Sequence, residues 1–338
     1  MRLETYTTLT SDLTKEFEEF LYKANSKFNP LFSSPIWAKR LKVLIFFDFR
    51  FLIVRDNKEI VALHLIFEGY RGYSRISKFP LYLKFILQKV LFIFYGYQIS
   101  YNFIVFKKDL DLPKINKSKK LIYKNVQTYG KRIVHFPIFD NDIKYFNSQK
   151  LNIIKWGTYT LNFSEKSYEK IFASYNRSAK KPINTARSIG VYVKKLKDSD
   201  LQGYAVWLKF NQAVTGKNYP VSEKAIKKDL DLMKKRGYIN EIFVAYLDNK
   251  ILGSLGIWGF RNFISEHGVN ISSYAKKNKI YVQELIKDEI IKYCFKNDIQ
   301  YYDLSGFNPN KNASDKEKSI KFFKEKFNGV KMIYDQII

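Results

Sequence analysis

The sequence predicts an α/β fold made of two related domains, and three observations lead to this prediction. The chain has 338 residues, which suits two domains of about 150 residues each better than one compact core. Segments with the alternating apolar pattern of strands are interspersed with segments of helical spacing along most of the chain. The third observation is a repeated hairpin pattern.

Two pairs of β-rich runs each flank an Asp-Asn-Lys turn. The first turn is at 56–58 and the second at 248–250, an offset of 248 − 56 = 192 residues. Short turns of this composition are typical of β-hairpins. The runs are 44–55 and 59–67 in the first pair, and 241–247 and 251–260 in the second. Two copies of one supersecondary unit indicate two related domains, which we place at 1–152 and 153–328.

The composition is that of a globular, strongly basic protein. Hydrophobic residues make up 46% of the chain and aromatic residues 17%, enough for two cores. The net charge is 59 − 32 = +27. Such a charge attracts polyanions, so tRNA, a phosphate-bearing acceptor and an anionic membrane face are the expected partners. The alternative explanation of this charge is a genome that encodes lysine frequently. The net charge alone does not distinguish among the three partners.

Cysteine and histidine usage argues against structural crosslinks. The single cysteine, Cys294, excludes a disulfide framework, and three histidines far apart in sequence argue against a structural zinc site. We therefore expect no metal and no tightly bound cofactor. Residues 1–17 are acidic and polar and lack the features of a signal peptide, which predicts a cytoplasmic protein, with the inner membrane surface as a further location. The expected form is a monomer.

In the first half, the pattern predicts an amphipathic helix at 13–24 and a very apolar segment at 79–106. Within this segment we predict a helix from Pro80 to Tyr95. Lysines interrupt it, so a core helix packed on a sheet is preferred to an interfacial amphipathic helix that touches a membrane. The charged stretch 107–120 predicts a surface loop.

In the second half, a strand at 156–163 leads into a helical region at 164–190, with an interruption expected at Pro182 and a helix end at Gly190. The basic residues of this region are candidates for phosphate binding, and the alternative is a solvated surface. They are Arg177, Lys180 and Lys181.

Adjacent acidic and imidazole side chains, Glu266 and His267, follow the second hairpin. A His beside a Glu is a candidate general base for an attacking amine, although a histidine at a strand end is more often structural.

The C-terminal stretch from 301 to 329 combines a strand, a turn and a helix. The strand breaks at Ser305 and Gly306, where we expect a residue that tolerates positive φ. After a polar loop, Ser314 and Glu317 have the spacing of a capping box that begins a helix. This helix is expected to end at 328–329.

Two short motifs in this stretch resemble the end of the second domain in the FemABX family of non-ribosomal aminoacyltransferases. They are Tyr-Asp-Leu-Ser-Gly at 302–306 and Phe-Phe-Lys-Glu-Lys-Phe-Asn-Gly at 322–329. The Ser-Pro-Ile-Trp run that ends at Trp37 is similar to the N-terminal signature of that family. The resemblance implies two tandem GNAT-like domains without a coiled-coil insertion, and a C-terminal segment, 329–338, that returns to the first domain.

The resemblance also implies roles for individual residues. Lys324 is the cation that stabilises the oxyanion and Phe323 shapes the site, while Lys39, two residues after Trp37, binds the acceptor. The family has an Arg just before Pro220, where this chain has Tyr219. Lys217 is a substitute for this Arg but lacks the bidentate guanidinium fork, so the acceptor is expected to differ from the usual cell-wall precursor.

The implied reaction is aminoacyl transfer from aminoacyl-tRNA to an amine of a peptide-type acceptor such as a cell-wall precursor. One alternative keeps the fold but uses acyl-CoA or an acyl carrier protein as donor. The other is a non-catalytic basic module that binds RNA or a membrane. The chain lacks the Gly-rich loop by which ordinary GNAT acetyltransferases hold coenzyme A, and this favours the tRNA donor. It also lacks a P-loop, a Rossmann fingerprint and a nucleophile elbow.

Overall fold

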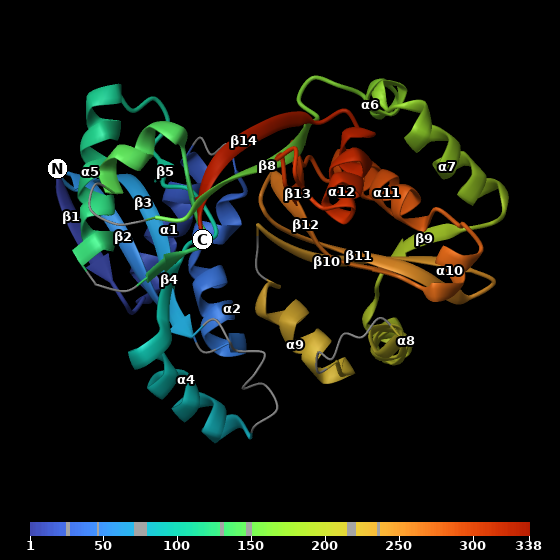
Figure 1. The fold of residues 1–338 in the computed structure, drawn as a ribbon, viewed down its shortest axis with the longest axis horizontal. Helices are drawn as coiled ribbons and strands as arrows, with labels where there is room; N and C mark the ends of the chain where they lie inside the picture. The colour runs from blue at the N-terminus through green and yellow to red at the C-terminus, as the bar shows by residue number, and fades with distance from the viewer. Residues whose placement is uncertain are drawn as a thin grey trace. The chain divides into compact units, whose positions relative to one another are not determined.

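The computed structural model describes residues 1–24, 28–45, 47–70, 80–128, 132–146, 151–214, 221–234 and 237–338. The predicted sites Lys217 and Tyr219 lie outside these residues. The chain divides into two compact units, Met1–Trp156 with Ile333–Ile338, and Gly157–Met332 (Figure 1). The first strand of the second unit, β8, begins before the division, at Ile153, so the units separate within a strand instead of a loop.

The first unit is built on a mixed sheet with the strand order β1-β2-β3-β4-β6, and β5 pairs with β3. Its strands are β1 (Arg2–Tyr6), β2 (Asp48–Asp56), β3 (Glu59–Tyr70), β4 (Gly96–Ile99), β5 (Val105–Phe106), β6 (Arg132–Val134) and β7 (Phe136–Ile138). Its helices are α1 (Ser11–Lys23), α2 (Pro35–Ile45), α4 (Leu81–Tyr95) and α5 (Leu112–Thr128), with 3₁₀ turns η1 (Pro30–Ser33) and η2 (Asp140–Phe146). The predicted hairpin is present as β2 and β3, joined across a turn in which Asn57 has φ 57°.

Two predictions for the first unit are wrong at the level of local structure. The stretch 107–120 is not a loop throughout, because α5 begins at Leu112. Most of its lysines face solvent, although Lys119 pairs with the buried carboxylate of Asp142. Ile122, Tyr123 and Val126 are buried in the core against β2 and β3. In the sequence, the charged residues of the first two turns of α5 obscured its amphipathic pattern. The strand expected from Leu44 begins only at Asp48, because α2 continues to Ile45.

The bounds predicted for the apolar helix match α4, but its predicted burial is wrong. Among the side chains of α4 that the structure describes, Gln88 is the buried one, whereas Ile93 and Phe94 have exposed fractions of 66% and 73%. The helix lies against the end of β3, so only one narrow face is covered. Among the helices of the described residues, none has the length and apolar character needed to cross a membrane.

The second unit has the strand order β14-β8-β13-β12-β11-β10-β9. Its strands are β8 (Ile153–Asn162), β9 (Tyr192–Lys195), β10 (Tyr238–Leu247), β11 (Lys250–Phe260), β12 (Phe263–Ile271), β13 (Tyr301–Phe307) and β14 (Val330–Ile337). The second predicted hairpin is β10 and β11. The last residues of β14 belong to the first unit, where they pair with β7.

The helices of the second unit cover both faces of this sheet (Figure 1). They are α6 (Tyr168–Ser174), α7 (Arg177–Ser188), α8 (Leu201–Val214), α9 (Glu223–Leu232), α10 (Ser273–Lys277), α11 (Val282–Lys296) and α12 (Asp315–Glu325), with the 3₁₀ turn η3 (Asp198–Asp200). The main core forms where α7 and α11 pack on one face. A smaller apolar cluster lies between α8, α9 and the opposite face.

The helical region at 164–190 is interrupted at a different place from the one predicted. Pro182 lies inside α7, and the break falls at Tyr175 and Asn176, which end α6 and begin α7. Apolar burial of Ala179, Ile183 and Ala186 stabilises α7 against the loss of one backbone hydrogen bond at the proline. The predicted helix end is confirmed, since Gly190 has φ 87°.

The C-terminal motif forms as predicted in its main elements. Ser314 and Glu317 make both hydrogen bonds of a capping box at the start of α12. The positive φ falls on Ser305, at 63°, and not on the neighbouring glycine, and the helix ends at Glu325, three residues earlier than predicted. Strand β13 continues through this turn to Phe307, with a shift in its pairing to β8 between Asp303 and Gly306.

Candidate functional site

The sheet of the second unit opens between two parallel strands. Strands β12 and β13 pair from Phe263 and Tyr301 to Ser265 and Asp303. Both strands continue beyond these residues, to 271 and 307, but their pairing with each other ends at Ser265 and Asp303. We call this opening the fork, formed by residues 266–268 of β12 and 304–306 of β13. Within the fork, the carbonyl of Glu266 accepts a hydrogen bond from the Ser305 hydroxyl at 2.7 Å instead of from a backbone N–H of the neighbouring strand.

A buried lysine of α12 reaches the β13 side of the fork. Lys324 is 6% exposed, and its Nζ donates to the carbonyl oxygens of Ser305 at 2.8 Å and Gly306 at 2.7 Å. The positive φ of Ser305 presents two consecutive carbonyls to one ammonium group, which a regular strand does not do. An ammonium has three donors, so these bonds leave one proton for another acceptor.

The charge of Lys324 is balanced by a neighbouring carboxylate. Burial lowers the pKa of Lys324 to about 8, and the charge of Asp303 opposes this shift. Asp303 accepts hydrogen bonds from the hydroxyls of Thr158 and Ser265 and, at 2.8 Å, from the backbone N–H of Ser305. Desolvation raises the pKa of Asp303 above its ordinary value, and the hydrogen bonds from these donors oppose part of this shift. The carboxylate therefore has a fixed position and its oxygens are engaged.

The β12 side of the fork contains a second buried ion pair. The ammonium of Lys287, 0% exposed on α11, donates to the carboxylate of Glu266, which is 5% exposed. Tyr302 donates to the same carboxylate oxygen at 3.2 Å. The Lys287 Nζ also lies 5.5 Å from the ring centre of Phe323 and 5.9 Å from that of Phe327. Phe323 thus covers the ion pair as well as flanking Lys324.

The predicted pair of Glu266 and His267 does not form. Adjacent residues of a strand point to opposite faces, and Glu266 faces α11 whereas His267 faces away from it. Glu266 is committed to Lys287. The imidazole of His267 stacks on Trp258, with 3.6 Å between ring centroids.

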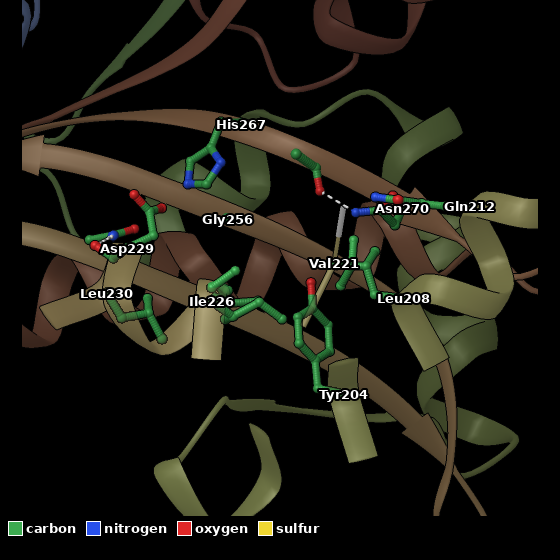
Figure 2. Close-up of a pocket in the computed structure, with 14 residues that line it drawn as sticks. Tyr204, Leu208, Gln212, Val221, Ile226, Asp229, Leu230, Gly256, His267 and Asn270 are labelled. Atoms are coloured by element: carbon green, nitrogen blue, oxygen red, sulfur yellow. Dashed lines mark hydrogen bonds between the residues drawn. The ribbon is translucent and has the colours of Figure 1, made fainter. Parts of the chain in front are cut away.

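His267 borders a pocket of about 300 Å³ between the sheet and helices α8 and α9 (Figure 2). Its imidazole lies over Gly256 on β11, where a Cβ would be 2.4 Å from the ring, so this position requires glycine for the ring to lie there. Figure 2 shows Tyr204, Leu208 and Ile226 pointing into the pocket from the helices. The polar lining residues are Gln212, Asp229, Asn240, His267 and Asn270. Such a mainly apolar cavity with a few polar groups suits a small organic moiety.

The remaining predicted site residues are more dispersed. Trp37 is 3% exposed in the first unit, and the guanidinium of Arg40 lies 4.8 Å from the centre of its ring. This packing is sufficient to explain a tryptophan at position 37. Lys39 on α2 is exposed and available to a ligand. On α7, Arg177 and Lys181 are exposed, while Lys180 donates to the carbonyl of Ala173.

The structure therefore brings together three of the predicted residues, Lys324, Phe323 and Glu266. It adds two that sequence reasoning missed, Lys287 and Asp303. The available signal was a charged residue at a buried position, since Lys287 lies within the apolar pattern of 282–294 and Asp303 within a β-rich run. In the described part of the chain no group of three or more metal-ligating side chains gathers.

Comparisons with known proteins define the fold. No protein-family model and no curated protein sequence matches the chain. Among solved structures, a tandem GNAT protein from the clavulanic acid biosynthesis pathway is similar with a TM-score of 0.54 and 7% identity over 100% of this chain and 98% of that one. L-PGS from Bacillus licheniformis has a TM-score of 0.54 and 12% identity over 96% of this chain and 91% of that one.

These similarities place the chain in the class of proteins with two tandem GNAT-like domains. More particularly, its fold is FemX-like. The crystal structure of FemX is similar to it with a TM-score of 0.65 and 12% identity, over 99% of this chain and 97% of the FemX chain. The predicted fold class and the predicted FemX-like arrangement are confirmed.

The buried ion pair gives the first testable prediction. Lys287→Met leaves the Glu266 carboxylate buried without a counter-charge, so we expect the free energy of unfolding to fall by about 3–5 kcal/mol. Adding Glu266→Leu removes the stranded charge and should restore much of that loss. Urea denaturation of both variants measures the difference.

A matched control is the solvent-exposed pair of Lys195 and Glu241, whose side chains are 48% and 28% exposed. Lys195→Met should change the free energy of unfolding by less than about 1 kcal/mol. An equal effect of the two Lys→Met changes would contradict the importance of the buried pair.

Proposed function

We propose that this protein is an acyltransferase that transfers an aminoacyl group from aminoacyl-tRNA to an amine. The observation that carries the proposal is the buried ammonium of Lys324 at the fork, bonded to two backbone carbonyls and retaining a third donor. A cation held rigidly in a water-poor site stabilises negative charge that develops on a carbonyl oxygen. The folds of FemX and of a tandem GNAT protein are consistent with this chemistry.

The reaction needs few protein groups. The amine nitrogen of the acceptor forms a bond to the ester carbonyl carbon, and the carbonyl oxygen becomes an oxyanion that accepts the remaining proton of Lys324 as a hydrogen bond. The bond from this carbon to the ribose oxygen then breaks, and the leaving oxygen takes the proton that the nitrogen loses. The carboxylates of Glu266 and Asp303 are both engaged, so we assign them to positioning the two ammonium groups.

The charge of the chain supports a polyanionic donor. A net charge of +27 favours tRNA, and exposed Lys39, Arg177 and Lys181 are suited to phosphates of the donor or acceptor. We propose an acceptor that carries an anionic phosphate and a peptide-type amine. The pocket beside His267 is suited to a part of such an acceptor. We further propose that the protein acts as a cytoplasmic monomer.

A second candidate function uses an acyl-CoA donor with the same fork. It is favoured by the similarity to the tandem GNAT protein of the clavulanic acid biosynthesis pathway, whose structure is described in a form without AcCoA. The two donors are separated by incubating the protein with a radiolabelled aminoacyl-tRNA mixture or with a labelled acyl-CoA mixture, each with a pool of amine acceptors. We expect transfer from tRNA that pretreatment with ribonuclease abolishes. Transfer from the thioester alone would favour the second candidate, and transfer from neither would favour a non-catalytic RNA-binding module.

Substitution of Lys324 tests the catalytic role. Lys324→Met should lower kcat by about 10² to 10³ with little change in KM, because the lost interaction forms in the transition state. The control is Lys318→Ala, an exposed lysine of the same helix, which should leave kcat unchanged. Circular dichroism and urea denaturation verify that both variants fold. An unchanged kcat in folded Lys324→Met would exclude the proposed role.

The pH profile provides an independent test. Because the pKa of Lys324 is about 8, its cation is lost as the pH rises above that value, and kcat should fall by up to about tenfold per pH unit. Lys324→Arg keeps its charge and should show no such decline, whatever its absolute rate.

Stability should move in the opposite direction from activity. Between pH 8 and the ordinary lysine value of 10.5, the unfolded chain holds a proton at Lys324 that the folded chain has released. This group therefore contributes an unfolding free energy that increases with pH in that window. A fall in kcat there that tracks unfolding in a parallel urea titration would count against the assignment.

A further inference from the structure

Helix α4 of the first unit exposes several large apolar side chains, which is unusual for a surface helix. Its exposed apolar side chains include Ile86, Val90, Ile93 and Phe94, with exposed fractions of 50%, 45%, 66% and 73%. These positions follow the spacing i, i+4, i+7 and i+8, which at 3.6 residues per turn keeps them within an arc of about 100°. They form one apolar stripe directed away from the protein, which we call the α4 stripe.

The side of α4 opposite the stripe is the side that packs on the protein. Gln88 lies about 170° from the centre of the stripe, given 3.6 residues per turn. It is 2% exposed, and its amide donates to the carbonyl of Tyr70 at the end of β3. Lys89 is 47% exposed at the flank and pairs with Asp48. These two polar contacts form with the stripe directed outward, and rotation of the helix to bury the stripe would break them.

The charge of α4 and of the whole chain indicates what covers the stripe. Helix α4 contains no Asp or Glu, and its charged residues are Lys84 and Lys89. The chain as a whole carries a net charge of +27. An exposed apolar stripe on a helix without acidic residues, in a strongly basic chain, matches an anionic lipid surface, where positive charges meet headgroups and the apolar face enters the acyl boundary.

The length of α4 fits a helix that lies in the plane of the interface. Its 15 residues span about 22 Å, less than the hydrocarbon thickness of about 30 Å. Aromatic residues Phe94 and Tyr95, 73% and 60% exposed, end the helix, and aromatic side chains favour the lipid–water interface. We propose that the α4 stripe docks this protein on an anionic membrane surface. This inference does not depend on the proposed transfer reaction.

Vesicle co-sedimentation of the full chain tests the proposal. We expect binding to vesicles of equal parts phosphatidylglycerol and phosphatidylcholine, weakened by added salt, and little binding to phosphatidylcholine alone. The double change Ile93→Ser and Phe94→Ser should weaken binding by about ten- to a hundredfold, because two large apolar groups leave the lipid. Circular dichroism verifies the fold of each variant.

The matched control is Leu112→Ser at the start of α5, in the same unit. Leu112 is 68% exposed, close to the 66% of Ile93, but lies outside the stripe, so its loss should leave binding unchanged while the single change Ile93→Ser weakens it. Equal effects of these two changes would overturn the proposal. So would absence of binding to the phosphatidylglycerol vesicles. Light scattering that shows a dimer of the native chain, dissociated by the double change, would assign the stripe to a second copy and also overturn it.

Discussion

The candidate site depends on two ammonium groups held in a buried place. Lys287 and Lys324 approach the fork from α11 and α12, and Lys287 pairs with Glu266. Burial lowers the pKa of both lysines, and the negative charge of Asp303 opposes this shift for each. Removing either cation from water has a large desolvation cost, which only nearby negative charge and directed hydrogen bonds offset. The need to satisfy these charges fixes the two helices relative to the strands.

The backbone conformation of β13 determines where the ammonium group of Lys324 lies. The left-handed turn at Ser305 and the shift in pairing between β13 and β8 direct two carbonyls to the same ammonium. The capping box fixes the start of α12, from which Lys324 projects three turns later. In the role that we propose for Lys324, a donor held by main-chain carbonyls needs little reorganisation when negative charge develops, and such preorganisation is a large source of electrostatic catalysis. The position of the ammonium therefore depends on strand geometry as much as on the lysine.

The two faces of the second sheet separate two kinds of environment. The ion pair of Lys287 and Glu266 lies with α11, and the pocket beside His267 lies with α8 and α9. Strand alternation divides the adjacent residues Glu266 and His267 between them. The imidazole of His267 lies so close to Gly256 that this position must be a residue without a side chain. On the first unit, a different arrangement occurs at α4, where Gln88 faces the protein and large apolar side chains face outward.

The sequence by itself determined the α/β class, the two hairpins, the capping box and the motif that contains Lys324, because these depend on local periodicity and on residue types with strong backbone preferences. It did not determine that α4 exposes its apolar face, since hydropathy gives the composition of a helix but not the direction in which it packs. Nor did it reveal Lys287 and Asp303. These two residues are buried only because α11, β12 and β13 pack together. Their desolvation therefore depends on contacts between residues that are distant in the chain.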